Sequence, residues 1–438
     1  MKLFPMTADI NSEGHLTIGD CDTIELVNKY GTPLYVIDEK AFKYKSNEYI
    51  NSLKKRYQDF LVLYAAKAFA CTSVFKIADQ IGLGLDVVSG GELYFALKTN
   101  VNKKNIYFHG NNKSLEEIDL AISSDIGKII CDNFYELELV QNIAEKRNKN
   151  IDILIRLTPG IECHTHEYIK TGHLDSKFGF DLEDYDDVLN FIKTKGKNLL
   201  LKGIHAHIGS QIFELKPFAD TIDILLEQFK YTKEKHKIEL TEINIGGGIG
   251  ISYTKEDDPI TIDKWAEITT STIKEKCKTL NLKLPKLICE PGRSLIGPSG
   301  ITLYKAGSTK QVPNGRKFIA VDGGMADNPR PITYQAKYTA VLANKMNSSE
   351  NMELVTIAGR YCETGDLLIK DILLPEIKAG DIIAVLNTGA YNYSMSSNYN
   401  MVPRPACVLV NEGTSEIIIE RETYSDLIKS HKTPKRFM

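Results

Sequence analysis

Eight short apolar runs recur along the chain between about Leu61 and Gly292, with polar segments between them. In order they read LVLYAAKA, GLDVVSG, IYFHG, KIICDN, IDILIRLTP, KGIHAHIG, EINIGGG and LICEPG. Each run is rich in Val, Ile and Leu and almost continuously apolar, which is typical of strands buried on both faces. The intervening segments, such as residues 114–124 and 134–148, are long enough to hold helices. Eight strand–helix units in succession predict an α/β fold, a (β/α)8 barrel of the TIM type, whose functional site lies at the carboxyl ends of its strands.

The pattern changes after about residue 300. Apolar runs then follow one another closely, with short turns between them: RKFIAVDGG, YTAVLAN, NMELVTIAG, DLLIKDILL, DIIAVLNTG, PACVLV and SEIIIERE. Asn411-Glu412-Gly413 joins the last two runs and suits a tight hairpin turn. Two strand-like pieces near the start of the chain, HLTIGD and PLYVID, are assigned to the same part of the fold. We therefore predict a barrel domain at residues 37–300 and a C-terminal antiparallel β domain, a β-barrel or sandwich, formed by residues 1–36 and 301–438.

Composition narrows the class of protein. At 438 residues the chain is too long for a single hydrophobic core, so two domains are expected. A composition of 42% apolar and 25% charged residues is typical of a globular enzyme. A net charge of −3 gives no indication of a nucleic-acid or anionic membrane surface. The chain contains no apolar run of about 18 residues and no signal-peptide pattern at its start. Its eight cysteines are scattered without a CxxC pair, which indicates reduced thiols. We expect a cytoplasmic protein with no nucleic-acid or membrane partner.

Lys67 ends the first apolar run and is the first candidate for chemistry. A lysine at a buried strand end is costly unless it is paired, neutralised or used covalently. Desolvation lowers the pKa of such an amine and makes it nucleophilic toward a carbonyl carbon. The alternative is a lysine with a buried stem whose ammonium reaches solvent or a carboxylate.

Two adjacent loops offer donors for an anion. A triple glycine, Gly246 to Gly248, follows the seventh run, while Gly292 and Arg293 follow the eighth. Glycines let backbone N–H groups approach an anion closely, and phosphate sites in such barrels commonly use the loops after strands seven and eight. Ser210, after the sixth run, adds a hydroxyl group. A glycine cluster alone would be explained by tight turns.

Glu290 ends the eighth run, where a buried carboxylate needs a cationic or hydrogen-bonding partner. A protonated pyridine nitrogen would serve, and it would keep the ring of a pyridoxal cofactor electron-poor. The alternative is a salt bridge with Arg293 or Lys67. His207 could stack on such a ring, and His205 could be a packing residue or a supporting donor.

At these positions the chain resembles the fold-type III pyridoxal-phosphate decarboxylases, and within them the diaminopimelate decarboxylase family. The resemblance is carried by YAAKAFA, LDVVSGGEL, FHGNNKS, TGHLDSKFGF, HIGSQI, INIGGGIG, EPGRSL, VDGGMADNPRPITYQAKY, CETGD and TGAYNYSMSSNYN. These segments run in family order from about Tyr64 to Asn400, so they cover nearly the whole chain. FHGNNKS and HIGSQI are much more specific than a glycine cluster. The resemblance implies pyridoxal 5′-phosphate as the cofactor and no metal ion.

The resemblance also implies roles for matching residues. Lys67 would join covalently to the cofactor aldehyde, His207 would stack on its ring, and Glu290 would pair with its ring nitrogen. Asp86 would form an ion pair with Arg156 beside the ring. The implied surroundings of the phosphate are Ser210, Gly246, Gly247, Gly248, Gly292, Arg293 and Tyr391.

Cys362, in YCETGD, resembles the family's proton donor, a thiol that one subunit contributes to the site of the other. The implied catalytic residues are Lys67, His207 and Cys362. The implied assembly is a homodimer with shared active sites, in which the β domain completes the site across the dimer.

The substrate that the resemblance implies is meso-2,6-diaminopimelate, which would yield L-lysine and carbon dioxide in the last step of lysine biosynthesis. Its distal end carries an amine and a carboxylate, and planar guanidinium groups suit the carboxylate. Glu363 could take the amine. The residues that match substrate-contacting positions are Arg293, Arg330, Tyr334, Glu363 and Tyr391. Arg330 could instead be a surface or phosphate-pairing arginine.

Three alternatives stay open. The same fold supports decarboxylases of ornithine, arginine or a carboxylated polyamine. A metal-dependent barrel hydrolase is suggested by His205-x-His207 and His164-x-His166. A non-catalytic cofactor carrier would keep Lys67 but lose the proton donor and the substrate arginines, all of which this chain has.

Overall fold

The computed structural model describes residues 2–161 and 176–438. The chain divides into two compact units. The first contains Met1–Phe42, Ser252–Asp257 and Ile296–Met438, and the second contains Lys43–Ile251 and Asp258–Leu295. Residues 37–42, 252–257 and 296–300, which the sequence analysis placed with the barrel, therefore belong to the first unit. The border predicted at residue 36 cuts through β4, Leu34–Asp38, a continuous strand.

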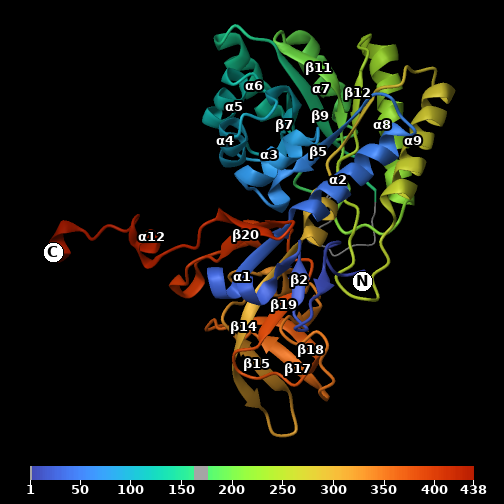
Figure 1. Cartoon of the computed structure of the whole chain (residues 1–438). Helices are drawn as coiled ribbons and strands as arrows, with labels where there is room; N and C mark the ends of the chain where they lie inside the picture. The colour runs from blue at the N-terminus through green and yellow to red at the C-terminus, as the bar shows by residue number, and fades with distance from the viewer. Residues whose placement is uncertain (1, 162–175) are drawn as a thin grey trace. The chain divides into compact units, whose positions relative to one another are not determined.

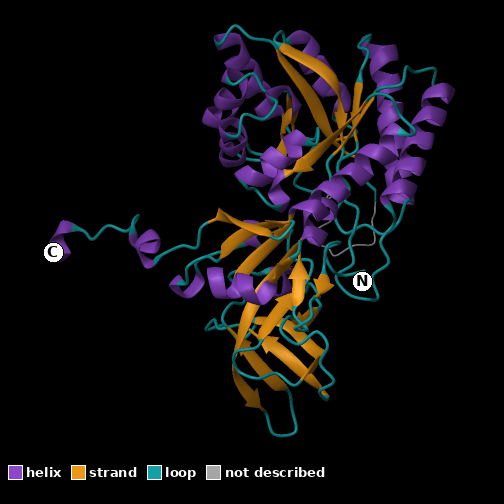
Figure 2. Cartoon of the chain, in the orientation of Figure 1, coloured by secondary structure: helices purple, strands orange, loops and turns teal. Residues whose placement is uncertain are grey.

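The second unit is a closed parallel barrel surrounded by helices (Figures 1 and 2). Its strands follow the order β5, β6, β7, β8, β9, β11, β12, β13, and β13 pairs in parallel with β5. The barrel strands are β5 Phe60–Ala65, β6 Gly84–Val87, β7 Ile106–Phe108, β8 Lys128–Cys131, β9 Ile151–Thr158, β11 Leu199–His205, β12 Glu242–Asn244 and β13 Lys286–Cys289; the short β10, Phe180–Asp181, pairs with the end of β9. Each predicted apolar run supplies one barrel strand, so the (β/α)8 prediction is confirmed.

Helices α3 to α9 follow the barrel strands in sequence. They are α3 Thr72–Gln80, α4 Gly90–Lys98, α5 Leu115–Ser123, α6 Phe134–Lys146, α7 Tyr185–Thr194, α8 Lys216–Tyr231 and α9 Ile262–Thr279. Polar residues in the strand-to-helix loops start several of them. Ser114 and Glu117 form a capping box at α5, and the Asn133 side chain accepts from the N–H of Glu136 at α6. The helices predicted near 114–124 and 134–148 are confirmed.

The barrel interior is filled by side chains. A buried apolar cluster contains Leu61, Leu63, Tyr107, Ile130, Leu154 and Ile288, contributed by five of the barrel strands. Helices cover the outer faces, so the strands are buried on both sides, which explains their almost uniformly apolar composition. The polar groups of the barrel consequently lie at its strand ends, where loops meet.

The first unit is built mainly from antiparallel strands (Figure 2). Its nine-stranded sheet contains β4, β14 Gly300–Gln311, β15 Lys317–Val321, β16 Ala340–Leu342, β17 Met352–Ala358, β18 Leu367–Pro375, β19 Ile382–Val385, β20 Ala406–Asn411 and β21 Thr414–Ile419. Two of its pairings, β4 with β20 and β15 with β17, are parallel. A small sheet contains β1 Asp9–Ile10, β2 Leu16–Ile18 and β3 Cys21–Asp22. The antiparallel β domain is confirmed, and both N-terminal strand-like pieces belong to it.

Few helices accompany these sheets. They are α1 Thr23–Tyr30, α11 Arg330–Tyr334 and α12 Tyr424–Ile428, while α2 Glu39–Lys54 and α10 Arg293–Ile296 each cross a border between the units. The predicted hairpin is present, because Asn411 pairs with Thr414 and both Glu412 and Gly413 have positive φ angles. Within the described parts of the chain, none of the helices combines the length and apolar character needed to cross a membrane.

Candidate active site

Lys67 lies in a short 3-10 turn, Ala66–Ala68, directly after β5. Its Nζ is 3.5 Å from Oδ2 of Asp86, a fully buried carboxylate on β6. β5 and β6 are neighbouring strands, and their register pairs Ala65 with Asp86. The expectation of a water-excluded amine is wrong, since 39% of the Lys67 side chain is exposed. The turn carries the lysine beyond the strand end, where a ligand can reach it.

The predicted ion pair between Arg156 and Asp86 is also wrong in its partners. Nη1 of Arg156 is 3.7 Å from Oδ1 of Asp132, and its guanidinium lies over the Phe178 ring. The reason is the strand order: Arg156 is on β9, beside β8 and β11, whereas Asp86 is on β6, beside β5 and β7. Burial lowers the pKa of Arg156, although Asp132, Glu290 and Asp86 oppose that shift.

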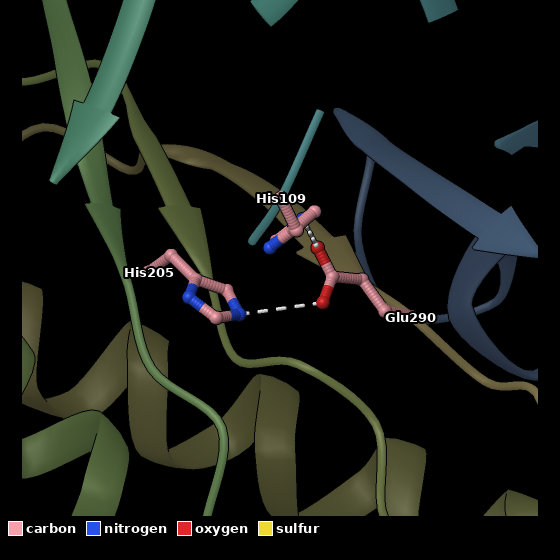
Figure 3. Close-up of side chains that lie close together, drawn as sticks. All are labelled: His109, His205 and Glu290. Atoms are coloured by element: carbon pink, nitrogen blue, oxygen red, sulfur yellow. Dashed lines mark ion pairs between the residues drawn. The ribbon is translucent and has the colours of Figure 1, made fainter. Parts of the chain in front are cut away.

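Glu290, directly after β13, is the buried carboxylate at the centre of the barrel mouth. Its Oε1 accepts from Nδ2 of Asn244 at 2.6 Å and lies 2.7 Å from Nε2 of His109. Its Oε2 lies 3.3 Å from Nε2 of His205, so the two histidines approach different oxygens (Figure 3). Burial alone would raise the pKa of Glu290, but His109 and His205 outweigh burial and hold that pKa well below its usual value. The contacts of Glu290 are thus made with two histidines and an asparagine.

His205 and His207, at the end of β11, have different surroundings. Burial lowers the pKa of His205 to about 3, although Glu290 opposes the shift. Burial also lowers the pKa of His207 well below its usual value, and the charges of Lys67 and Arg156 add to the effect. Nδ1 of His207 accepts from the N–H of Gly247 at 3.3 Å. Both rings are therefore uncharged near neutral pH, which suits stacking better than acid catalysis.

The triple glycine after β12 is required by close backbone approach. A Cβ on Gly247 would lie 2.3 Å from the carbonyl oxygen of Glu290, and Gly246 has a φ of +66°. The N–H of Ile212 donates to the carbonyl of Gly248 at 2.9 Å, which ties this loop to the one after β11. These backbones are packed too closely for side chains, as an anion cradle requires.

Arg293, at the start of α10, is buried and donates twice to Ser210. Its Nε and Nη2 lie 3.2 and 2.9 Å from Oγ of Ser210. The structure therefore brings the loops after β11, β12 and β13 together, as the sequence analysis expected. Gly292 belongs to the same region, where a Cβ would lie 3.0 Å from the Cβ atoms of Ala65 and Ala68.

The other predicted residues belong to the first unit. Arg330 is buried at the start of α11, its Nη1 donates to the Tyr338 hydroxyl at 2.6 Å, and its guanidinium lies 4.8 Å from the Tyr253 ring centre. Burial alone would lower the pKa of Arg330, but Tyr253 and Tyr338 raise it. Tyr334 ends the same helix, and Tyr391, with a φ of +60°, also influences the Arg330 pKa.

Cys362 and Glu363 lie in the loop between β17 and β18, and both side chains are exposed. The N–H of Cys362 donates to Oδ1 of Asn400 at 2.9 Å. The loop rests against α11, since a Cβ on Gly365 would lie 2.7 Å from Cδ1 of Ile332. The thiol is thus presented outward by a loop whose backbone is fastened.

Two buried carboxylates fasten this loop from beneath. Asp366 accepts from the N–H groups of Met325 and Tyr361 at 2.6 and 2.9 Å. Asp327 accepts from the hydroxyls of Tyr304 at 2.5 Å and Tyr361 at 3.3 Å. Burial raises the pKa of Asp327 to about 7, although the Tyr304 hydrogen bond opposes the shift.

Sequence reasoning missed His109, Asn244, Asp132, Asp327 and Asp366. The sequence contained a signal for the first two. His109 lies in the FHGNNKS motif, and Asn244 precedes the triple glycine at a strand end. His109, His205 and Glu290 present ligand atoms within 4.8 Å of one another, a set able to hold a metal ion. Of the two pairs suggested by the sequence, His205-x-His207 contributes only His205 to that set, since His207 faces Gly247, and His164-x-His166 lies outside the described residues.

The residues at the barrel mouth fit a pyridoxal phosphate. Both oxygens of Asp86 are buried without a hydrogen-bond partner among the described residues. An ionised Glu290 suits a protonated ring nitrogen, and the glycine loops with Arg293 suit a phosphate. Lys67 supplies an accessible amine at the same strand ends.

Comparison with known proteins agrees with this fit. The sequence model of the pyridoxal-dependent decarboxylase pyridoxal binding domain matches residues 45–297. A diaminopimelate decarboxylase of Synechocystis sp. is 49% identical, with 100% of this chain and 94% of that protein covered. The Bacillus subtilis diaminopimelate decarboxylase is 43% identical, with coverage of 97% and 96%.

Solved structures give the same result for the fold. The diaminopimelate decarboxylase of M. jannaschii in complex with L-lysine matches with a TM-score of 0.92 and 36% identity, covering 100% of both chains. The chain therefore belongs to the pyridoxal-dependent decarboxylases, and within them to the diaminopimelate decarboxylase family.

Proposed function

We propose that this protein is a pyridoxal-phosphate-dependent carboxy-lyase that converts meso-2,6-diaminopimelate into L-lysine and carbon dioxide, the last step of lysine biosynthesis. The observation that carries the proposal is full-length similarity to diaminopimelate decarboxylases, at 49% identity to the Synechocystis relative. The M. jannaschii relative, which shares the fold, was crystallised with L-lysine, the product expected here.

The second unit supplies the residues that would hold the cofactor. When bound, pyridoxal phosphate provides an electron sink for the charge left at the substrate α-carbon as carbon dioxide departs. Lys67 is the group for covalent attachment, and Asp86 holds its amine in place until a ligand arrives. Glu290 keeps a negative charge for the ring nitrogen, and the uncharged His207 ring offers an apolar face.

The phosphate end would be held by the three loops that meet at Ser210, Gly246–Gly248 and Gly292–Arg293. Arg293 is anchored through two N–H groups on Ser210, which fixes its charge without neutralising it. Guanidinium groups bind phosphate oxygens through paired hydrogen bonds. Tyr391, assigned to the phosphate by the family resemblance, is a residue of the first unit.

The first unit would supply the proton donor and the contacts to the distal end of the substrate. Cys362 carries an exposed thiol and Glu363 an exposed carboxylate, and each is presented by a backbone that hydrogen bonds hold. Arg330 is buried and charged, and the Tyr338 bond uses one of the five N–H groups of its guanidinium. Arg330, Tyr334 and Tyr391 together suit a distal carboxylate, and Glu363 suits a distal ammonium.

We further propose that two copies of the chain share their sites, with Cys362 of each copy serving the other. An exposed apolar stripe supports a subunit contact: Met352, Leu354 and Leu373 are 57%, 58% and 60% exposed, and Leu354 pairs with Leu373 across β17 and β18. These residues and Gly365, from the Cys362 loop, line one hollow of about 1220 Å³. Apolar patches of this kind are typical of protein interfaces.

Release of carbon dioxide from meso-diaminopimelate and from ornithine, assayed side by side, tests the substrate. We expect turnover of diaminopimelate with stoichiometric formation of L-lysine. The alternative of an ornithine, arginine or polyamine decarboxylase would be supported by turnover of those amino acids with no reaction of diaminopimelate.

Complementation tests the shared site. Subunits carrying Lys67→Ala and Cys362→Ala, each inactive alone, are co-expressed with different tags and the mixed dimer is purified. If sites are shared, one of its two sites has both wild-type residues, and about half of wild-type activity returns. If each chain uses its own Cys362, the mixed dimer stays inactive.

We also propose that the protein works in the cytoplasm. The cysteines of the described residues are all free thiols, as expected in a reducing compartment. Fractionation of the source cells, followed by immunodetection, tests this location.

A further inference from the structure

The loop after β7, His109 to Ser114, is a part of the barrel mouth for which the proposed reaction gives no role. It contains most of the FHGNNKS motif, the segment that stood out as specific in the sequence. His109 follows β7 directly, and its N–H donates to the carbonyl of Val87 at 2.8 Å. Only 5% of the residue is exposed. Its ring points toward Glu290, and it meets the His205 ring edge to face, with centres 4.8 Å apart (Figure 3).

The position of Nε2 of His109 links two carboxylates. It lies 2.7 Å from Oε1 of Glu290 and 3.7 Å from Oδ1 of Asp86. Asn244 approaches the same Oε1 at 2.6 Å, so two groups converge on one oxygen of Glu290. The other oxygen, Oε2, has a single longer contact, to His205 at 3.3 Å. One carboxylate oxygen is thus fixed, and the other retains capacity for a further donor.

The loop that carries His109 is held by Lys113. Nζ of this buried lysine donates to the carbonyls of Gly110 and Ile130 at 2.9 and 2.8 Å and to Oε1 of Glu136 at 2.6 Å. These acceptors belong to the loop itself, to β8 and to α6, so one ammonium ties three segments together. A lysine at this depth with all three donors used is a rigid anchor.

We propose that His109 is a positioning residue, which acts through Glu290 to orient the carboxylate that pairs with the cofactor ring nitrogen, and that Lys113 fixes the loop for this purpose. The inference rests on the proposed function in one respect, the pairing of Glu290 with that nitrogen. His109 does not touch the reacting atoms of the substrate in this proposal. Its contribution is to hold one oxygen of Glu290 so that the other faces the ring.

The surrounding charges explain why such a support is needed. Glu290 is buried, and the titratable groups that interact with it are His109 from the β7 loop, His205 from β11, His207 from the loop after β11, Arg156 from β9, Tyr107 from β7 and Cys289 from β13. His205 is uncharged near neutral pH and is the more distant histidine. Nε2 of His109, 2.7 Å from Oε1, is therefore the closer histidine atom to the carboxylate and the larger influence of the two histidines that favour its ionised form. Without it, Oε1 of Glu290 would keep only the Asn244 hydrogen bond, and the carboxylate would be less firmly oriented and would ionise less readily.

Two substitutions separate the polar Nε2 atom from the shape of the ring. His109→Phe keeps an aromatic ring against His205 and removes the Nε2 contact to Glu290, whereas His109→Gln restores a polar group near the position of Nε2. Asn112→Ala is the matched control, because Asn112 is an exposed residue of the same loop. Each protein is reconstituted with pyridoxal phosphate, and the cofactor dissociation constant, the pH dependence of the cofactor absorption band, kcat and KM are measured.

We expect His109→Phe to lower kcat by about 10- to 100-fold with KM for diaminopimelate changed less than about threefold, by analogy with supporting groups around bound cofactors. The pH at which the absorption band loses its protonated-ring character should fall, and His109→Gln should recover most of both losses. An unchanged band in His109→Phe, or equal damage in His109→Gln, would overturn the inference. Failure of the wild-type protein to give a borohydride-trapped cofactor adduct on Lys67 would instead overturn the proposed function itself.

Discussion

The mouth of the barrel and the Cys362 loop hold their functional groups in opposite ways. At the barrel mouth, Asp86, His109, His205 and Glu290 are all buried and lie in one continuous cluster of contacts. In the Cys362 loop the functional side chains, Cys362 and Glu363, are exposed, and the buried carboxylates Asp327 and Asp366 lie beneath them and bind the backbone.

The difference indicates that the barrel mouth and the Cys362 loop have different roles. The buried cluster at the barrel mouth lies within the second unit, and its members contact one another directly. The backbone of the Cys362 loop is held by hydrogen bonds while its functional side chains are exposed, as expected of a surface that completes a site elsewhere. A buried site tunes ionisation by desolvation, whereas an outward loop depends on the accuracy of its support.

Substitution of Lys67 should have the largest effect on activity. In Lys67→Ala the covalent attachment is lost, and no other described amine lies 3.5 Å from Asp86 to replace it. We expect turnover to fall by roughly 10⁴-fold or more. Mass spectrometry after borohydride reduction should show the cofactor adduct on wild-type Lys67 and no adduct in the variant. Turnover within tenfold of wild type would show that the barrel mouth does not work through this amine.

Substitution of Cys362 tests the other half of the comparison. Cys362→Ala removes the proposed acid, and loss of a general acid typically costs about 10²- to 10⁴-fold in rate. Because the thiol belongs to the first unit, the cofactor dissociation constant should stay at the wild-type value. Glu363→Gln in the same loop is a useful contrast, since it should raise KM for diaminopimelate more than it lowers kcat. Full activity of Cys362→Ala would assign proton donation to another group.

Much of this architecture could be predicted from the sequence, and the exceptions have physical causes. The eight apolar runs gave every barrel strand, because burial on both faces imposes a composition that a single sequence displays. The glycine loops and Glu290 were found because they end those runs. The partners of Arg156 and Asp86 were not predictable, since they depend on which strands become neighbours when the barrel closes.

The missed residues have a different cause. Asp327 and Asp366 lie in loops, and their burial arises from long-range packing of the Tyr35, Tyr304 and Tyr361 region. Asp366 sits against Gly324 and Gly359, residues that are adjacent only after β15 and β17 pair in parallel. Local sequence pattern does not reveal a pairing between segments separated by more than 30 residues.

Substitution of Asp366 tests whether the support beneath Cys362 matters. Asp366→Ala removes the acceptor for two N–H groups, that of Tyr361 in the loop itself and that of Met325 in the segment between β15 and α11. We expect kcat to fall by about tenfold, because small displacements of a catalytic group are costly, while cofactor affinity stays unchanged. Asp366→Asn keeps one acceptor oxygen and should be milder. A kcat at the wild-type level in Asp366→Ala would show that the loop needs no such support.

The last prediction concerns Asp327 and the pH dependence of stability. Of the substitutions considered, Asp327→Asn should change turnover least. The pKa of Asp327 is raised to about 7 by burial, whereas an aspartate in an unfolded chain ionises near 3.9. The folded protein therefore keeps a proton that the unfolded chain releases. This contribution to stability is complete below about pH 4 and is lost as the pH rises to about 7, a change of up to about 4 kcal/mol.

Urea unfolding of wild type and Asp327→Asn at several pH values between 5 and 8 measures this term. Asparagine cannot ionise, so the free energy of unfolding of the Asp327→Asn protein, relative to that of wild type, should increase with pH between 5 and 8. The groups that face Asp327 are Tyr304, Tyr361 and Asp366, and the nearby Asp366 opposes ionisation of Asp327. Asp371→Asn is the matched control, because Asp371 is an exposed aspartate of the same unit whose pKa is lowered by Arg316. Parallel stability curves for wild type and Asp327→Asn would mean that Asp327 does not change its ionisation between pH 5 and 8, which would contradict a pKa raised to about 7.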